Sequence, residues 1–155
     1  MKCKIRSLLV FLSAILFSMS SSNLSAQTAN QIANSHLISP AELVQILQSK
    51  KAKPLLLHMG SHVLYSQAHI PGSEYVGPGF NEAGIQQLRK RVASLPRSKF
   101  IIVYCGCCPW NHCPNLKPAD DTLAGMGFTN VKVLYIPSNF GADWVDRGYP
   151  VVSGD

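Results

Sequence analysis

Two short, uninterrupted apolar runs constrain the fold of this chain more than any other feature. Residues 54–59 read PLLLHM and are followed by Gly60, and residues 100–104 read FIIVY. Continuous apolar runs of this length are typical of strands that are buried on both faces of a parallel sheet. Residues 131–135 (VKVLY) favour a further strand. The chain is therefore expected to contain a parallel sheet whose two faces are both covered.

Segments with helical spacing of apolar residues alternate with these strands. Ser39-Pro40-Ala41-Glu42 is a capping-box sequence and predicts a helix over residues 40–49. Further helices are predicted over residues 81–95, around residues 119–126 with Gly127 as the C-terminal cap, and over residues 140–146. Because 46% of the 155 residues are hydrophobic, the chain can form a core. The alternation predicts an α/β domain with a central parallel sheet flanked by helices.

The first 26 residues have the pattern of a secretory signal peptide. Three positive side chains, Lys2, Lys4 and Arg6, precede an apolar run of eleven residues, shorter than the about 20 that a membrane-spanning helix needs. We expect cleavage after Ala26 and an exported protein, periplasmic or secreted, without a membrane anchor. Residues 27–38 are predicted to be a flexible lead, and residues 39–152 a single domain.

The basic residues of the chain do not indicate a nucleic-acid partner. The formal net charge is +6, but three of the positive charges belong to the expected signal peptide. The other basic groups are short, Lys50-Lys51 and residues 89–91 (RKR), and are typical of solvated helix ends or faces. Nucleic-acid binding is therefore not expected.

Four cysteines lie within nine residues: Cys105, Cys107, Cys108 and Cys113. Cysteines that staple a small fold are spread along the chain, so this cluster indicates chemistry in one loop. The loop follows a buried strand and precedes a helix, which is where ligands bind in open α/β sheets. Cys105 directly follows the strand, and we expect loop amides and the helix N-terminus to lower its pKa.

In several motifs along its sequence, the chain resembles the single-domain rhodaneses, which have the sulfurtransferase fold. The matching residues are the turn 69–73 (HIPGS) with Tyr65 before it, residues 102–105, Leu123 with residues 127–131, and Trp144 with residues 148–151. The resemblance implies that Cys105 takes up a sulfane sulfur as a persulfide and passes it to a nucleophile. It also implies that His69 is a structural residue of its turn.

Two departures from the family's pattern bear on the substrate. Residues 58–60 read HMG where the family usually carries Asp-x-Arg, and the cysteine loop holds no arginine or lysine before Lys117. Without these cations, the dianion thiosulfate is expected to be a poor substrate. We expect a small sulfur-containing substrate or a protein thiol as the partner, and no cofactor.

The additional thiols leave three interpretations open. In the first, Cys105 transfers sulfur; in the second, Cys105 and Cys108 form a C-x-x-C pair of a thiol–disulfide oxidoreductase. In both, Cys105 attacks, Cys108 or Cys113 resolves the adduct, and the substrate contacts Gly106, Cys107, Trp110 and His58. Trp110 and His58 could instead have purely structural roles. Trp110 would then cover apolar surface, and His58 would be a histidine of the core.

The third interpretation is non-enzymatic. Cys107, Cys108, His112 and Cys113 could ligate zinc or copper(I), since thiolate and imidazole suit both ions. The other non-enzymatic possibility is that the chain is an inactive rhodanese-type module that recognises a partner.

Overall fold

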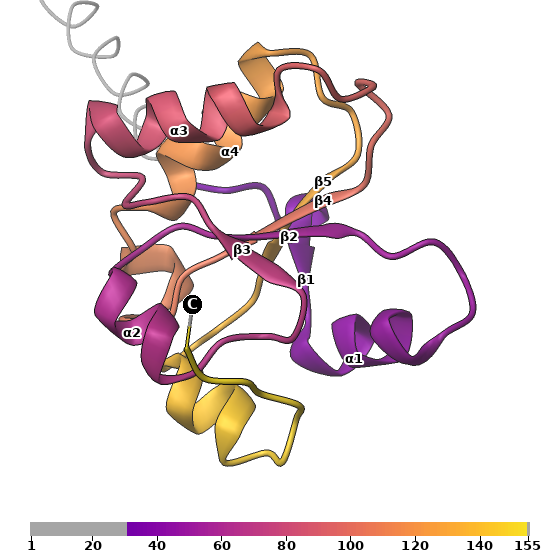
Figure 1. Cartoon of the computed structure of the whole chain (residues 1–155), viewed down its shortest axis with the longest axis vertical. Coiled ribbons are helices and arrows are strands. Elements are labelled where there is room, and N and C mark those ends of the chain that lie inside the picture. Colours follow the sequence, from indigo (N-terminus) through magenta and orange to yellow (C-terminus); the bar gives the residue numbers. More distant parts are fainter. Residues whose placement is uncertain (1–30, 155) are drawn as a thin grey trace, which may run out of the picture.

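The computed structural model describes residues 31–154 of the chain, and within this range the centre is a five-stranded parallel sheet (Figure 1). The strand order is β1-β5-β4-β2-β3, with β4 in the middle. The strands are β1 (Leu37–Ile38), β2 (Leu55–His58), β3 (Ser73–Tyr75), β4 (Ile101–Tyr104) and β5 (Val131–Leu134). The expected α/β fold with a central parallel sheet is confirmed. The expected signal peptide, residues 1–26, lies outside the described residues.

Helices cover both faces of the sheet, as the apolar runs predicted. Figure 1 shows α3 (Glu82–Val92) and α4 (Leu116–Gly125) on one side, and α1 (Pro40–Gln48) with the short helix η4 (Gly141–Val145) on the other. Neighbouring residues of one strand enter different cores: Leu57 packs with the α3 and α4 side, and Leu56 with the α1 and η4 side. β2 and β4, whose residues are all buried, thus bury both of their faces.

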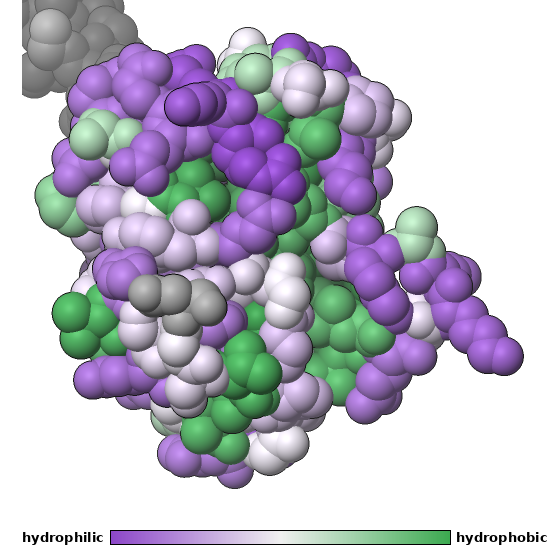
Figure 2. Space-filling model, in the orientation of Figure 1, coloured by the Kyte–Doolittle hydropathy of each residue, from purple (hydrophilic) through white to green (hydrophobic). Residues whose placement is uncertain are grey.

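Local sequence signals set the helix ends. Ser39 and Glu42 form the predicted capping box at the start of α1. Asn81 accepts a hydrogen bond from the Gly84 backbone N–H at 2.9 Å and begins α3. Gly127 follows α4 with φ +85°, a conformation that favours glycine and ends the helix. The outer side of α3 is largely hydrophilic (Figure 2), in keeping with its exposed Arg89 and Lys90.

Residues 31–38 belong to the segment that the sequence predicts as a flexible lead, and the structure places a short helix and a strand there. Residues 27–30 lie outside the described residues. A short helix, η2 (Asn34–His36), leads into β1, which pairs with the edge of β5. The Ile32 side chain is buried, and His36 Nδ1 lies 3.0 Å from a carboxylate oxygen of Asp120 on α4. A two-residue strand carries no detectable periodicity, so only its pairing with a distant strand reveals it.

The structure also contains two elements without a clear signal in the sequence. They are α2 (His62–Gln67) and β3 (Ser73–Tyr75), which flank the turn at residues 69–73. No helix among the described residues is long and apolar enough to cross a lipid bilayer.

Candidate active site at the end of the central strand

Cys105 occupies the carboxyl end of the middle strand. Tyr104, the last residue of β4, lies opposite His58 of β2, and the Met59 backbone N–H donates to the Tyr104 carbonyl at 2.8 Å. Cys105 follows Tyr104 directly, and only 2% of its surface is exposed. The pairing of β4 with its neighbours therefore holds the backbone of Cys105 in place, as the sequence predicted.

The cysteine loop is tied to the segment that follows β5. The Trp110 backbone N–H donates to the Ile136 carbonyl at 2.8 Å, and the Phe140 N–H donates to the Gly106 carbonyl at 3.2 Å. A Cβ at residue 106 would lie 3.2 Å from Phe140 Cβ, which leaves little room for a side chain there. The loop also contains a short helix, η3 (Trp110–His112). Remote contacts thus decide the path of the loop.

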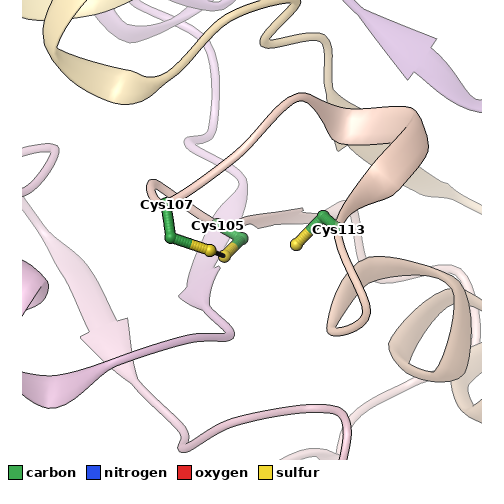
Figure 3. Close-up of side chains that lie close together, drawn as sticks. All are labelled: Cys105, Cys107 and Cys113. Atoms are coloured by element: carbon green, nitrogen blue, oxygen red, sulfur yellow. Dashed lines mark hydrogen bonds between the residues drawn. The ribbon is translucent and has the colours of Figure 1, made fainter.

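Three of the four cysteine sulfurs gather at one point (Figure 3). The Sγ atoms of Cys105, Cys107 and Cys113 all lie within 4.8 Å of one another, and those of Cys105 and Cys107 are 3.4 Å apart. Cys108 Sγ lies 3.2 Å from Cys107 Sγ, at the edge of this group. All four are free thiols, with Cys105 and Cys113 buried and Cys107 exposed. The Cys105 sulfur is therefore in contact with that of Cys107, which sequence reasoning had given a substrate contact.

Asn115 is a site residue that sequence reasoning missed. It stands at the N-cap position of α4, but its side chain makes no capping hydrogen bond. Its amide Nδ2 instead lies 3.5 Å from Cys105 Sγ and 3.8 Å from Cys113 Sγ. Its Oδ1 accepts the Phe80 backbone N–H at 3.2 Å, which orients the amide so that its donors face the sulfurs. An asparagine directly before a helix is typical of an N-cap residue, so nothing in the sequence indicated that Asn115 contacts the cysteine sulfurs.

The expected lowering of the Cys105 pKa is wrong. A hydrogen bond to Cys113 raises this pKa most, and burial and repulsion by Cys113 raise it further. Hydrogen bonds with Cys107, including one from its backbone N–H, oppose these effects only in part. Burial likewise raises the pKa of Cys107, and raises that of Cys108 to about 11 with help from a hydrogen bond to Cys107. Cys105, Cys107 and Cys108 therefore rest largely protonated at neutral pH.

His58 lies beside this group with a polar atom that is unsatisfied among the described residues. Its side chain is 2% exposed, and Nδ1 is buried without a hydrogen-bond partner there. The ring packs against Tyr104, with ring centroids 5.0 Å apart, and against Tyr65. Burial lowers the pKa of His58 to about 4, with smaller contributions from His69 and His62. His58 is therefore neutral at pH 7 and supplies no positive charge to a thiolate.

This lowered pKa predicts acid sensitivity. Between pH 6.5 and about 4, the His58 side chain binds a proton in the unfolded chain but not in the folded chain. The free energy of unfolding should therefore fall as the pH drops through this window and stay level above it, by ~2–3 kcal/mol at pH 4.5. Urea unfolding at pH 7 and pH 4.5 measures the loss. His58→Gln should show a smaller loss, whereas His112→Gln, at an exposed site, should match the unaltered chain; equal losses in all three would contradict the prediction.

A surface cavity of about 410 Å³ adjoins the thiols. Its lining includes three of the expected substrate-contacting residues, His58, Gly106 and Cys107, together with Tyr104 and Phe140. Neither lysine nor arginine contributes to this lining in the described part of the chain.

The fourth expected contact, Trp110, lines a different cavity of about 450 Å³ together with His112 and Cys113. Its ring is half-buried against the core and lies 5.8 Å from that of Tyr135. The loop thus divides its residues between two cavities, and His112 is exposed in the second, hydrogen-bonded to its neighbour Asn111.

Gly60 lies against the site where the resemblance placed an arginine. A Cβ added at residue 60 would lie 3.0 Å from both Cys105 Sγ and His58 Cε1. The sulfur and the imidazole therefore both pack against this backbone, and a side chain there would have to displace one of them. The packing around Gly60 therefore leaves little room for a cationic side chain at this position.

The turn at residues 69–73 is structural, as expected for His69. Its Nδ1 lies 2.9 Å from the Tyr65 carbonyl, and its ring stacks on the Tyr65 ring with centroids 3.9 Å apart. Gly72 has φ +77°, which favours glycine at this place. Ser73 Oγ hydrogen-bonds the Tyr104 hydroxyl at 2.7 Å and so ties the turn to β4.

Comparison with known proteins gives a consistent result. The family model described as "Rhodanese-like domain" matches residues 39–135, a range that includes β2, β4 and the cysteine loop. A search of curated proteins found no match.

Solved structures share the architecture at low identity. The chain is similar to the Alr3790 protein from Anabaena (23% identity, TM-score 0.59, covering 76% of this chain and 92% of that one). It is also similar to the BH2092 protein from Bacillus halodurans (22%, TM-score 0.59, 77% of each chain). A thiosulfate sulfurtransferase from Pseudomonas aeruginosa matches at 20% identity with a TM-score of 0.55, covering 77% of this chain but 20% of that one. At such identities the likeness establishes the fold alone.

Proposed function

The chain belongs to the rhodanese-like domain family, and on this premise we propose that it is an exported sulfurtransferase that carries a sulfane sulfur as a persulfide on Cys105. The observation that carries the proposal is the pair formed by Cys105 and Cys107. The buried Sγ of Cys105, at the end of the middle strand, lies 3.4 Å from the exposed Sγ of Cys107, which lines the 410 Å³ cavity. Because the buried Cys105 thiol contacts the exposed Cys107 thiol, a sulfur atom can pass in two steps, from a donor to Cys105 and from Cys105 to Cys107 at the surface.

The first step loads Cys105. Its thiolate attacks the outer sulfur of a donor persulfide, R–S–SH; a new S–S bond forms on Cys105, and the donor S–S bond breaks. The donor leaves as a thiolate and takes up the proton that Cys105 gave up, so no oxidant or reductant is consumed. Asn115 Nδ2 and the Cys107 backbone N–H donate toward the Cys105 sulfur and support the transient negative charge.

The second step moves the sulfur outward. The Cys107 thiolate attacks the outer sulfur of the Cys105 persulfide, a bond forms to Cys107, and Cys105 leaves as a thiolate. Cys107 then presents the persulfide at the cavity, where an acceptor thiol can take it. Hydrogen bonding to Cys113, together with burial, raises the pKa of Cys105, and burial raises the pKa of Cys107. The rate of both steps should therefore increase with pH from neutral toward alkaline values.

The donor is expected to be a persulfide rather than thiosulfate. No lysine or arginine lines the cavity among the described residues, and His58 is neutral at pH 7. The two negative charges of thiosulfate could therefore be stabilised there only by amide dipoles. Losing a charged hydrogen bond corresponds to ~1.5–3 kcal/mol, so kcat/KM with thiosulfate should be roughly 10- to 100-fold below that with a persulfide donor. Steady-state kinetics with both donors and a common thiol acceptor measures the ratio.

A matched pair of variants tests the stated cause. Gln67 lines the same cavity and is exposed, so Gln67→Arg adds a cation there, whereas Gln67→Met adds none. Gln67→Arg should raise turnover with thiosulfate, and Gln67→Met should leave it unchanged. Thiosulfate turnover as fast as persulfide turnover in the unaltered chain would contradict the proposal.

A thiol–disulfide oxidoreductase is the second candidate, favoured by the contact between the Cys105 and Cys107 sulfurs. Such an enzyme would link its own two thiols while it reduces a substrate disulfide. Cys107→Ser separates the candidates. It should let a persulfide accumulate on Cys105 if sulfur is transferred, and a mixed disulfide with the substrate if disulfides are exchanged. Mass spectrometry of the peptide that contains Cys105 distinguishes the two adducts.

Export rests on the pattern of residues 1–26, and it predicts a defined N-terminus. Protein recovered from a secretion-competent host should begin at or near Gln27, because the small-residue site ends at Ala26. N-terminal sequencing decides this. Recovery of the protein from the cytoplasm with Met1 intact would contradict export and leave the proposed chemistry untouched.

A further inference from the structure

The three sulfurs of Cys105, Cys107 and Cys113 form a group that the proposed sulfur transfer uses only in part. Their Sγ atoms lie within 4.8 Å of one another, and Cys113 adds a second buried sulfur to the Cys105–Cys107 pair (Figure 3). We propose that these three thiols form a binding site for a soft monovalent cation, copper(I). The proposal does not depend on the sulfurtransferase activity, because binding can be measured without turnover.

The spacing of the sulfurs suits a three-coordinate ion. A metal–sulfur bond of about 2.3 Å places the sulfurs of a trigonal site about 4 Å apart. The Cys105 and Cys107 sulfurs are 3.4 Å apart, and no pair in the group exceeds 4.8 Å. Small side-chain movements would therefore bring all three sulfurs to bonding distance, without rearrangement of the backbone that β4 and α4 hold.

The donor set favours copper(I) over zinc or harder ions. The group consists of sulfur alone among the described residues, and thiolates select soft ions such as copper(I). Structural zinc sites take four ligands in a tetrahedron. The fourth thiol, Cys108, contacts Cys107 but lies outside the group. His112, which the sequence made a candidate ligand, lies outside it as well.

The surroundings already resemble the outer shell of a metal site. Asn115, 4% exposed, directs its amide donors toward the Cys105 and Cys113 sulfurs, and the Phe80 backbone holds that amide in place. Hydrogen bonds of this kind orient the ligands of a metal and stabilise their charge. Cys105 and Cys113 close the inner side of the site, whereas exposed Cys107 leaves a path from solvent. Copper(I) would bind with release of thiol protons and without electron transfer.

The test is a titration of the full chain, reduced and kept free of oxygen, with copper(I) against a coloured copper(I) chelator. Every variant carries Cys3→Ser, so that the fifth cysteine of the chain does not contribute. We expect one copper(I) per chain, bound tightly enough to take it from the chelator, with X-ray absorption reporting three sulfur neighbours. Failure to compete with the chelator would overturn the proposal, whatever the result of the sulfur-transfer assays.

Single substitutions identify the ligands. Cys113→Ser should weaken copper(I) binding by at least roughly 10- to 100-fold, and Asn115→Ala by roughly 10-fold, without changing the stoichiometry. Cys108→Ser is the matched control and should leave the affinity within about 3-fold, since its sulfur lies outside the group. If Cys108→Ser weakens binding as much as Cys113→Ser, or if four sulfurs surround the ion, the three-thiol site is wrong.

A second substitution guards against misfolding. Circular dichroism of each variant without metal reports whether it is folded. Should buried Cys113 prove necessary for folding, Cys107→Ser removes a ligand from an exposed position and should cause the same loss of affinity. Unchanged binding in a folded Cys107→Ser would equally overturn the proposal.

Discussion

Replacing Cys105 with serine is expected to abolish sulfur transfer, with a fall in turnover of about 10³-fold or more. A hydroxyl at this position can neither form a persulfide nor ionise to a comparable nucleophile near neutral pH. The measurement is a single-turnover reaction with a persulfide donor, followed by mass spectrometry of the peptide that contains residue 105. The unaltered chain should gain the mass of one sulfur atom on Cys105, and Cys105→Ser should gain none.

The control for this prediction is another cysteine of the same loop. Cys108→Ser removes a thiol whose sulfur contacts Cys107 but lies outside the three-thiol group, and it should still load sulfur on Cys105. Full activity in Cys105→Ser, or sulfur found first on Cys113, would mean that the nucleophile is wrongly assigned. Sulfur found on Cys107 after a delay is expected, since Cys107 is proposed to receive it second.

Replacing Gly79 with alanine is expected to lower the stability of the fold strongly. A Cβ at this residue would lie 2.2 Å from the Asn115 carbonyl oxygen and 3.0 Å from its carbonyl carbon. Because the obstructing atoms belong to the backbone, α4 or the loop before it must shift, at a cost of ~3 kcal/mol or more in the free energy of unfolding. Urea unfolding monitored by circular dichroism measures this loss.

The same substitution should also affect the site. Movement of Asn115 would draw its amide away from the Cys105 and Cys113 sulfurs, so persulfide loading should slow even where the variant stays folded. Gly125→Ala is the matched control, because its added Cβ would meet no described atom within 4 Å other than its chain neighbours and the backbone of its own helix. It should leave loading unchanged and shift stability by less than ~1 kcal/mol, toward greater stability. Equal stability of the two variants would contradict the steric argument.

The raised pKa of Cys105 separates this site from one that activates its cysteine with a cation. Hydrogen bonding to Cys113 and burial favour the neutral thiol, and the cavity beside it has no described lysine or arginine. A crowded thiol group is poorly suited to hold several negative charges unless protons or a metal ion compensate them.

The fold was accessible from local patterns in the sequence. The apolar runs that became β2 and β4 needed burial on both faces, and the capping box at Ser39 began α1 where it was predicted. Such signals act over a few residues, because backbone hydrogen bonds and side-chain periodicity within one element produce them. The position of Cys105 directly after β4 is likewise a local property, and it was predicted correctly.

The arrangement within the site depended on residues far apart in the chain. The loop path follows from contacts with Ile136 and Phe140, and the orientation of the Asn115 amide follows from Phe80. These contacts bring Cys107 and Cys113 to Cys105. Hydrogen bonding to Cys113 and burial there raise the pKa of Cys105, which the sequence pattern suggested would be lowered. By itself the sequence determined that a parallel sheet would present Cys105 at the end of a buried strand. Which thiols meet it, and whether they ionise, was decided by tertiary packing, because desolvation and charge repulsion depend on atoms that only the folded chain brings together.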